Sequence, residues 1–90
     1  MDLEKIKSKI QKLVNHYDAG NYTYVIKEAG ILIRKIPNNL FLMNLIGSCF
    51  QKINQLGKAK RIFEDIIALD KQNVHALNNL ANTLKTLKNY

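Results

Sequence analysis

The sequence predicts an all-α protein of five helices arranged as repeated helix–turn–helix hairpins. Three observations lead to this prediction. Apolar residues recur every three or four positions in five segments, which is the spacing of one helical face. Glycine, proline or asparagine interrupts the pattern between the segments. Several residue types also return after 34 positions, as a structural repeat requires.

The first two segments predict a helical hairpin. The first has its apolar face on Leu3, Ile6, Ile10, Leu13, Val14 and Tyr17. Asp2 is the expected N-cap, and Gly20 is expected to end this helix in a left-handed conformation. The second has its apolar face on Tyr22, Val25, Ile26, Ala29, Leu32, Ile33 and Ile36. Pro37 should end it, because proline disfavours helical geometry in the preceding residue.

The next two segments predict a second hairpin. Asn38 and Asn39 offer a cap, and the third apolar face follows on Leu42, Met43, Leu45, Ile46, Cys49, Phe50 and Ile53. A face this wide predicts a helix packed between two neighbours. Asn54 is expected to adopt a left-handed turn conformation. The fourth apolar face is Leu56, Ala59, Ile62, Phe63, Ile66, Ile67 and Leu69.

The last segment predicts a fifth helix without a partner of its own. Asn73 is its expected N-cap, and its apolar face is Val74, Leu77, Leu80, Ala81, Leu84 and Leu87. These residues cannot all be covered by the preceding helices. Exposed apolar surface of this kind favours self-association, for which the candidates are Leu77, Leu80, Leu84 and Leu87. A homodimer through this C-terminal helix is therefore one expectation.

The chain is strongly basic. Its 90 residues include 14 lysines and arginines against seven acidic residues, for a net charge of +7, and twelve of the 14 are lysines. Such a surface favours acidic partners, anionic membranes or nucleic acid, or is simply a solvated coat. The chain has few arginines, and therefore few guanidinium groups that could make bidentate contacts with phosphate or guanine. This disfavours nucleic acid as the partner.

The polar residues do not form a catalytic or metal-binding pattern. Cys49 lies in an apolar run, which predicts a buried thiol in a reducing, cytoplasmic compartment. His16 and His75 are too few to complete a zinc site with it. Glu64 and Asp65 are adjacent and project in different directions on a helix. We therefore expect a non-catalytic protein without metal or cofactor, and no run of residues is apolar enough to span a membrane.

The 34-residue period is visible in identical residues. It relates Gly47 to the small residue Ala81, and it also relates the pairs Asn39 and Asn73, Asn44 and Asn78, and Ile33 and Ile67. Apolar character returns at the same offset in many other positions. A helical hairpin of this length resembles the tetratricopeptide repeat over nearly the whole chain. Matching positions are Gly47, Phe50, Ala59, Phe63 and the closing Pro37.

The sequence also departs from that family. Met43 stands where tryptophan is favoured, and Lys71 replaces the second closing proline. On the resemblance, repeat one covers residues 2–37, repeat two covers 40–71, and 74–88 is the first helix of a third repeat. Tyr90 aligns with Leu56 and Tyr22, which open second helices, so we expect a fragment of a longer array.

The resemblance implies a right-handed α-solenoid with a concave groove lined by the first helix of each hairpin. The implied groove residues are Gln11, Asn15, Phe41, Asn44, Ser48, Lys52, His75, Asn78, Asn79, Asn82 and Lys85. Ser8, Lys12 and Gln51 belong to the same predicted faces. Asparagine amides donate and accept hydrogen bonds, so such a lining suits the backbone of an extended peptide.

The groove resembles the asparagine-lined, superhelical type attached to sugar-transferring enzymes. The family's clamp for C-terminal carboxylates needs lysines and an arginine, whereas the equivalent positions here are Gln11, Asn15, Leu45, His75 and Asn79. We therefore expect a protein-interaction scaffold that binds a protein or peptide. Two alternatives remain: an RNA-binding helical repeat of pentatricopeptide type using the lysine-rich surface, and a self-association module.

Overall fold

The computed structural model describes residues 2–89, and within them the protein consists of five α-helices and no β-strand. The helices are α1 (Leu3–Asp18), α2 (Tyr22–Lys35), α3 (Leu40–Lys52), α4 (Leu56–Leu69) and α5 (Val74–Leu87). The predicted all-α class and the five predicted segments are therefore confirmed. Tyr90, which the sequence aligns with two helix starts, lies outside the described residues.

Short polar side chains cap three helix N-termini as predicted. Asp2 accepts a hydrogen bond from the backbone N–H of Glu4 at 3.2 Å. Asn39 and Asn73 each accept one from the backbone N–H three residues later, at 2.9 Å in both cases. Each bond satisfies a backbone donor that has no partner within its helix. The starts of α1, α3 and α5 therefore follow from local chemistry.

The turns also depend on residues that tolerate left-handed backbone. Gly20 has φ 83° and Asn54 has φ 65°, as their positions after α1 and α3 predict. Asn38 shares the φ of 65°, which the sequence interpretation did not foresee, because it assigned this residue to a cap. Asparagine and glycine are the residues that adopt this conformation at least cost.

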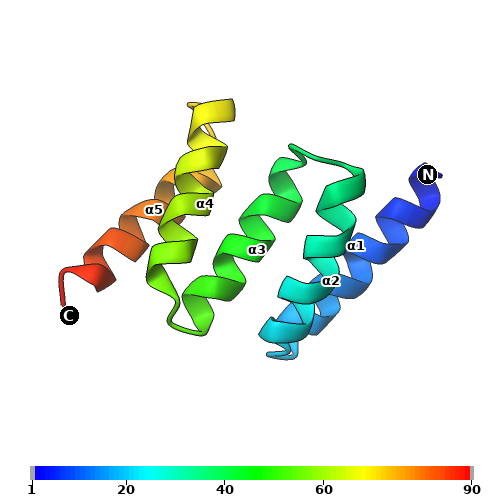
Figure 1. The fold of residues 1–90 in the computed structure, drawn as a ribbon, viewed down its shortest axis with the longest axis horizontal. Coiled ribbons are helices and arrows are strands. Elements are labelled where there is room, and N and C mark those ends of the chain that lie inside the picture. The colour runs from blue at the N-terminus through cyan, green and yellow to red at the C-terminus, as the bar shows by residue number, and fades with distance from the viewer. Residues whose placement is uncertain (1, 90) are drawn as a thin grey trace.

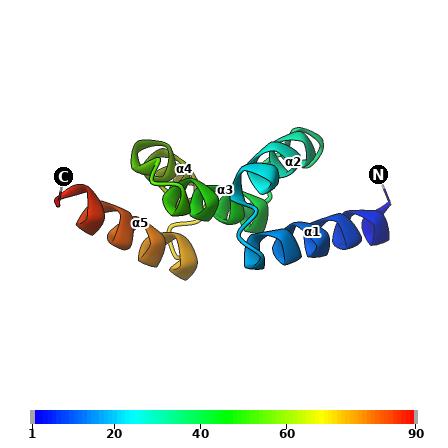
Figure 2. The same ribbon diagram turned by 90° about the horizontal axis from the view of Figure 1, so that it is seen from below.

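The helices alternate between two layers. Figure 2 shows α1, α3 and α5 along one side of the molecule, with α2 and α4 on the other. Each helix packs against the next in the chain, and α3 also contacts α1 and α5. The elongated body measures 42 × 28 × 18 Å, with the termini at opposite ends (Figure 1).

Two hydrophobic clusters share α3. On one face, Leu42, Leu45 and Cys49 join a core made with α1 and α2 that includes Leu13, Val25, Ala29 and Leu32. On another face, Leu40, Met43 and Phe50 pack against Ala59, Phe63, Ile66 and Ala76 of α4 and α5. The prediction that the third helix lies between neighbours is confirmed.

Gly47 marks the closest approach of α3 and α4. A Cβ atom on Gly47 would lie 2.6 Å from Cε1 of Phe63, whose side chain is fully buried. Such a distance is far below ordinary van der Waals contact, so any larger residue at this position requires the ring of Phe63 to shift. Gly47 is also one of the positions at which the sequence resembles the tetratricopeptide repeat.

The buried face of α5 differs from the one that apolar residues predict. Its fully buried residues are Ala76 and Thr83, whereas Val74, Leu77 and Leu84 are 63%, 43% and 40% exposed. Ala76 packs against Ala59, Phe63 and Ile66 of α4, and Thr83 contacts Gln51 of α3. The prediction that α5 cannot bury its whole apolar face is confirmed.

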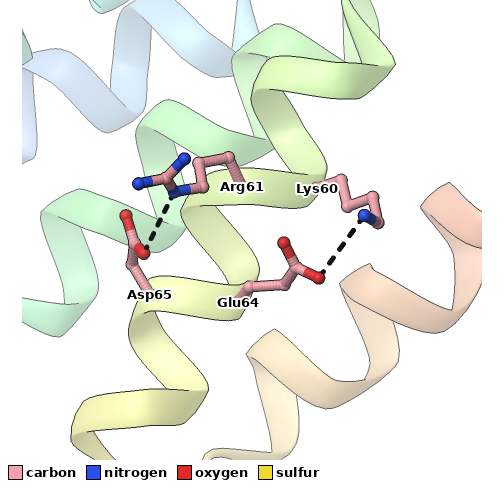
Figure 3. Close-up of polar contacts among 4 residues, drawn as sticks. All are labelled: Lys60, Arg61, Glu64 and Asp65. Carbon is pink, nitrogen blue, oxygen red and sulfur yellow. Dashed lines mark ion pairs between the residues drawn. The ribbon is translucent and has the colours of Figure 1, made fainter.

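The surface of α4 carries two ion pairs along its axis. Figure 3 shows Lys60 beside Glu64 and Arg61 beside Asp65, with nitrogen–oxygen distances of 3.5 Å in both pairs. Both pairs are solvent-exposed, and the cation precedes the anion, which is the less favourable order on a helix. They contribute little to stability.

Candidate functional site

A cavity of about 380 Å³ lies on the side of the molecule formed by α1, α3 and α5. We call it the groove. Its lining residues are Tyr17, Leu40, Phe41, Asn44, Leu45, Ser48, Asn73, His75 and Asn79. All three helices of this layer contribute, so the groove exists only because the hairpins pack in series.

Helical spacing places the groove side chains of α3 and α5. On α3, Phe41, Leu45 and Ser48 follow one another at intervals of four and three residues, next to the buried face. On α5, His75 and Asn79 are one turn apart. Phe41 is 55% exposed, so its aromatic surface is accessible at the groove.

An amide pair joins α3 to the start of α5 at the groove. Asn44 donates from Nδ2 to Oδ1 of Asn73 at 3.3 Å, and the same Oδ1 accepts from the backbone N–H of Ala76. This fixes the orientation of Asn44, because a flipped amide would bring two oxygens together. Its own Oδ1 is buried without a hydrogen-bond partner, which is costly for a polar group.

A second polar bridge between α3 and α5 replaces a predicted groove contact. Gln51 donates to Oγ1 of Thr83 at 3.0 Å, and Thr83 donates to the carbonyl oxygen of Asn79 at 2.8 Å. The sequence interpretation placed Gln51 on the groove face. Its amide instead satisfies the buried hydroxyl of Thr83, so it holds the two helices together.

Tyr17 forms part of the groove wall, and its hydroxyl is partly shielded from water. Burial is the largest cause of a raised pKa for this phenol, and the nearby Cys49 and Tyr22 raise the pKa further. A side-chain hydrogen bond with Ser48 acts in the opposite direction. Tyr17 is therefore a neutral hydrogen-bonding group at neutral pH.

The structure brings together some of the predicted groove residues and not others. Phe41, Asn44, Ser48, His75 and Asn79 line the groove. The predicted residues outside its lining, all of them exposed, are Gln11, Asn15, Lys52, Asn78, Asn82 and Lys85. Gln11 donates a hydrogen bond to Asn15 along α1 at 3.0 Å.

The predicted groove residues did not include four of the lining residues. Tyr17 was assigned to an apolar face, Leu40 was left unassigned, and Asn73 was assigned only to a cap. Leu45 was assigned to an apolar face, although the resemblance also placed it at a position equivalent to the carboxylate clamp. Leu40 and Leu45 lie beside the predicted groove residues Asn44 and Phe41 on the surface of α3, which was the available indication for these two. Tyr17 lies on the side of α1 opposite the predicted groove residues, so periodicity gave no indication of its role. Residues at the edge of a core face serve both the core and the adjacent cavity.

The remaining reactive groups do not converge. Cys49 is fully buried, and burial raises the pKa of its thiol from 9.0 to about 11, which leaves it unreactive at neutral pH. In residues 2–89, no three His, Cys, Asp or Glu side chains are grouped so that they could hold a metal ion. None of the described helices is long and apolar enough to cross a membrane.

No protein-family model matches the chain, and no curated protein shows significant sequence similarity to it.

Proposed function

We propose that the protein is a non-catalytic scaffold that binds an extended peptide of a partner protein in the groove. The observation that carries this proposal is the cavity itself, which combines an exposed phenylalanine with hydrogen-bonding side chains from different helices. Ser48, His75 and Asn79 offer donors and acceptors to a peptide backbone. Phe41 offers a surface for one apolar side chain of the peptide.

We propose further that the chain is a right-handed α-solenoid of tetratricopeptide type. The 34-residue period, the alternation of helices between two layers and the Gly47–Phe63 contact support this assignment. In such an array each hairpin adds its first helix to one continuous concave surface. A peptide lying along that surface would cross α1, α3 and α5.

The test is selection of binding peptides from a random library, followed by affinity measurements on matched variants. Asn79→Ala removes an amide that lines the groove, and Asn78→Ala removes an exposed amide one residue away. We expect Asn79→Ala and Phe41→Ala each to weaken binding by about 1–2 kcal/mol, with little effect of Asn78→Ala. Equal effects of the two asparagine variants would contradict the groove assignment.

Self-association is a second candidate function, favoured by one observation. Leu77 and Leu84 are 43% and 40% exposed and lie one above the other on the flank of α5 away from the groove. A second copy that packs the same flank against this one would remove both from water. This association leaves the groove open, so it is compatible with peptide binding.

We propose that a peptide is a better candidate ligand of the groove than RNA. The groove contains no lysine or arginine, whereas cations that neutralise phosphates supply most of the non-specific affinity for nucleic acid. Binding of a random RNA with a steep salt dependence would reverse this order.

We also propose that the protein is in a reducing, cytoplasmic compartment. The free and buried thiol of Cys49 supports this proposal.

A further inference from the structure

A second cavity, of about 220 Å³, lies between α1 and α2 and shares no lining residue with the groove. We call it the hairpin cavity. Its α2 side includes the buried Leu32 and the series Tyr24, Glu28, Ile31 and Lys35, which follow one another at intervals of four, three and four residues. This spacing defines one helical face, next to the face that Val25 presents to the core.

The hairpin cavity has an apolar interior. Tyr24 and Ile31 line it while remaining 45% and 47% exposed, so both offer apolar surface that a ligand could cover. At one end, the ring of His16 packs against that of Tyr24 with centroids 4.4 Å apart. The cavity therefore offers a preformed apolar site that the protein itself does not fill.

The rim of the hairpin cavity is basic. Lys9 and Lys12 lie on its α1 side and Lys35 on its α2 side, against the single acidic residue Glu28. Within residues 2–89, the ion pairs closer than 4.0 Å are both on α4, so these three ammonium groups are not engaged in one. The sequence interpretation assigned Lys12 to the groove, and the structure places it here instead.

We infer that the hairpin cavity binds an acidic segment of a partner protein that inserts one large apolar side chain between α1 and α2. The inserted side chain would cover Tyr24 and Ile31. Carboxylates on either side of it would pair with lysines on both rims of the cavity. This site is independent of the groove, so it would take a different segment or a different partner.

Charge decides between this occupant and a second copy of the chain. The flank of α5 carries the exposed leucines that a copy could offer, but α5 contains Lys85 and no acidic residue. With a net charge of +7 on each chain, placing α5 against the lysine rim would bring like charges together. An acidic segment with one apolar side chain could cover Tyr24 and Ile31 as the leucines of α5 could, but its charge is opposite to that of the lysine rim.

Fluorescence anisotropy with two labelled peptides tests the inference. In one peptide a single tryptophan is flanked by glutamates, and in the other the tryptophan is flanked by lysines. We expect only the acidic peptide to bind, with an affinity that falls as salt is added. On addition of the acidic peptide, the backbone amide signals of the protein that shift in NMR spectra should belong to α1 and α2. No binding at millimolar peptide, or signals that move at the groove instead, would overturn the inference.

Matched variants separate the cavity from general charge. Lys35→Glu and Lys27→Glu change the net charge equally on the same helix, but only Lys35 lines the cavity. We expect Lys35→Glu and Ile31→Glu to weaken binding about fivefold to tenfold, and Lys27→Glu less than about twofold. Circular dichroism checks that each variant is folded.

Equal weakening by Lys35→Glu and Lys27→Glu would show that only net charge matters and would reject the cavity. Vesicles of phosphatidylserine and a polyuridine RNA are the competing probes. If either bound the protein more tightly than the acidic peptide and lost affinity in Lys35→Glu, the partner would be a lipid or a nucleic acid, and the inference would be wrong.

Discussion

Gly47 is the residue whose size matters most for the fold. It lies opposite the fully buried ring of Phe63, and added atoms at this position have no free space. Gly30 is the opposite case, because a Cβ atom built there meets nothing within 4 Å. The two glycines therefore separate the effect of packing from the effect of backbone entropy.

We predict opposite effects of alanine at these two positions. Gly47→Ala should lower the free energy of unfolding by about 1–3 kcal/mol, because the buried ring must shift. Gly30→Ala should raise it by about 0.5–1 kcal/mol, because alanine loses less backbone entropy in a helix. Urea denaturation of the three proteins measures both changes. Stabilisation by Gly47→Ala would show that α3 and α4 are further apart than described.

Cys49 provides a second test at the residue scale. The thiol is fully buried, and its pKa rises from 9.0 to about 11 on folding. At about pH 8 the native protein should react with a disulfide reagent far more slowly than the urea-unfolded chain, because only the thiolate attacks. Equal rates would mean that the thiol is accessible in the native state.

The same shift determines the direction of a pH effect on stability. Between pH 9 and about 11 the folded state keeps the thiol proton while the unfolded state loses it. Stability should therefore fall as the pH rises through this range, and the effect should vanish below pH 9. A Cys49→Ala variant lacks this contribution, so the difference between the two pH profiles isolates it from the titration of lysines and tyrosines.

At the scale of the helices, the N-cap side chains differ in the hydrogen bonds that they accept. Asn39 satisfies one backbone donor, whereas Oδ1 of Asn73 also accepts the amide of Asn44. Gln55 precedes α4 without a side-chain cap hydrogen bond. The three positions form a graded series within one protein.

We predict that replacement by alanine follows that series. Asn73→Ala should cost about 2 kcal/mol, Asn39→Ala about 1 kcal/mol, and Gln55→Ala close to zero. The extra cost at Asn73 arises because the amide of Asn44 loses its acceptor. Thermal and urea unfolding measure all three. An effect of Asn73→Ala no larger than that of Asn39→Ala would argue against the bond between Asn44 and Asn73.

At the scale of the whole molecule, the proposed self-association through α5 can be tested directly. Leu84 is 40% exposed on the free flank of α5, and Leu69 is 52% exposed on α4. We predict that the protein dimerises at tens of micromolar, and that Leu84→Lys makes it monomeric while Leu69→Lys does not. Analytical ultracentrifugation distinguishes these states. A wild-type chain that stays monomeric at millimolar concentration would reject the proposal.

Much of the fold could be predicted from the sequence because helix starts, helix ends and turns are decided within a few residues. Asp2, Asn39 and Asn73 cap their helices as expected, and Gly20 and Asn54 have the expected left-handed backbone. Thr83 shows the limit of this reasoning. Its hydroxyl donates locally to the carbonyl oxygen of Asn79, but it also accepts a hydrogen bond from Gln51, which is 32 residues away and which local pattern does not predict.

The candidate site was predictable only in part, for a geometric reason. Helical periodicity orders side chains around an axis, so it correctly joined Phe41 with Ser48 and His75 with Asn79. It does not determine how far a helix is rotated against its neighbours. Packing of the small residue Ala76 against α4 sets that rotation for α5, and it leaves Asn78 outside the groove lining.

The sequence by itself determined the all-α class and the order of the helices, because both depend on local backbone preference and on helical periodicity. The close contact at Gly47 was expected only from the resemblance to a repeat family, and the tertiary structure shows it against Phe63. Only the tertiary structure decided which side chains share a cavity. Lys12 is one example, since sequence assigned it to the groove and packing placed it with Ile31 in the hairpin cavity. Cavities arise between helices, and their lining depends on crossing angles and rotations that no single helix specifies.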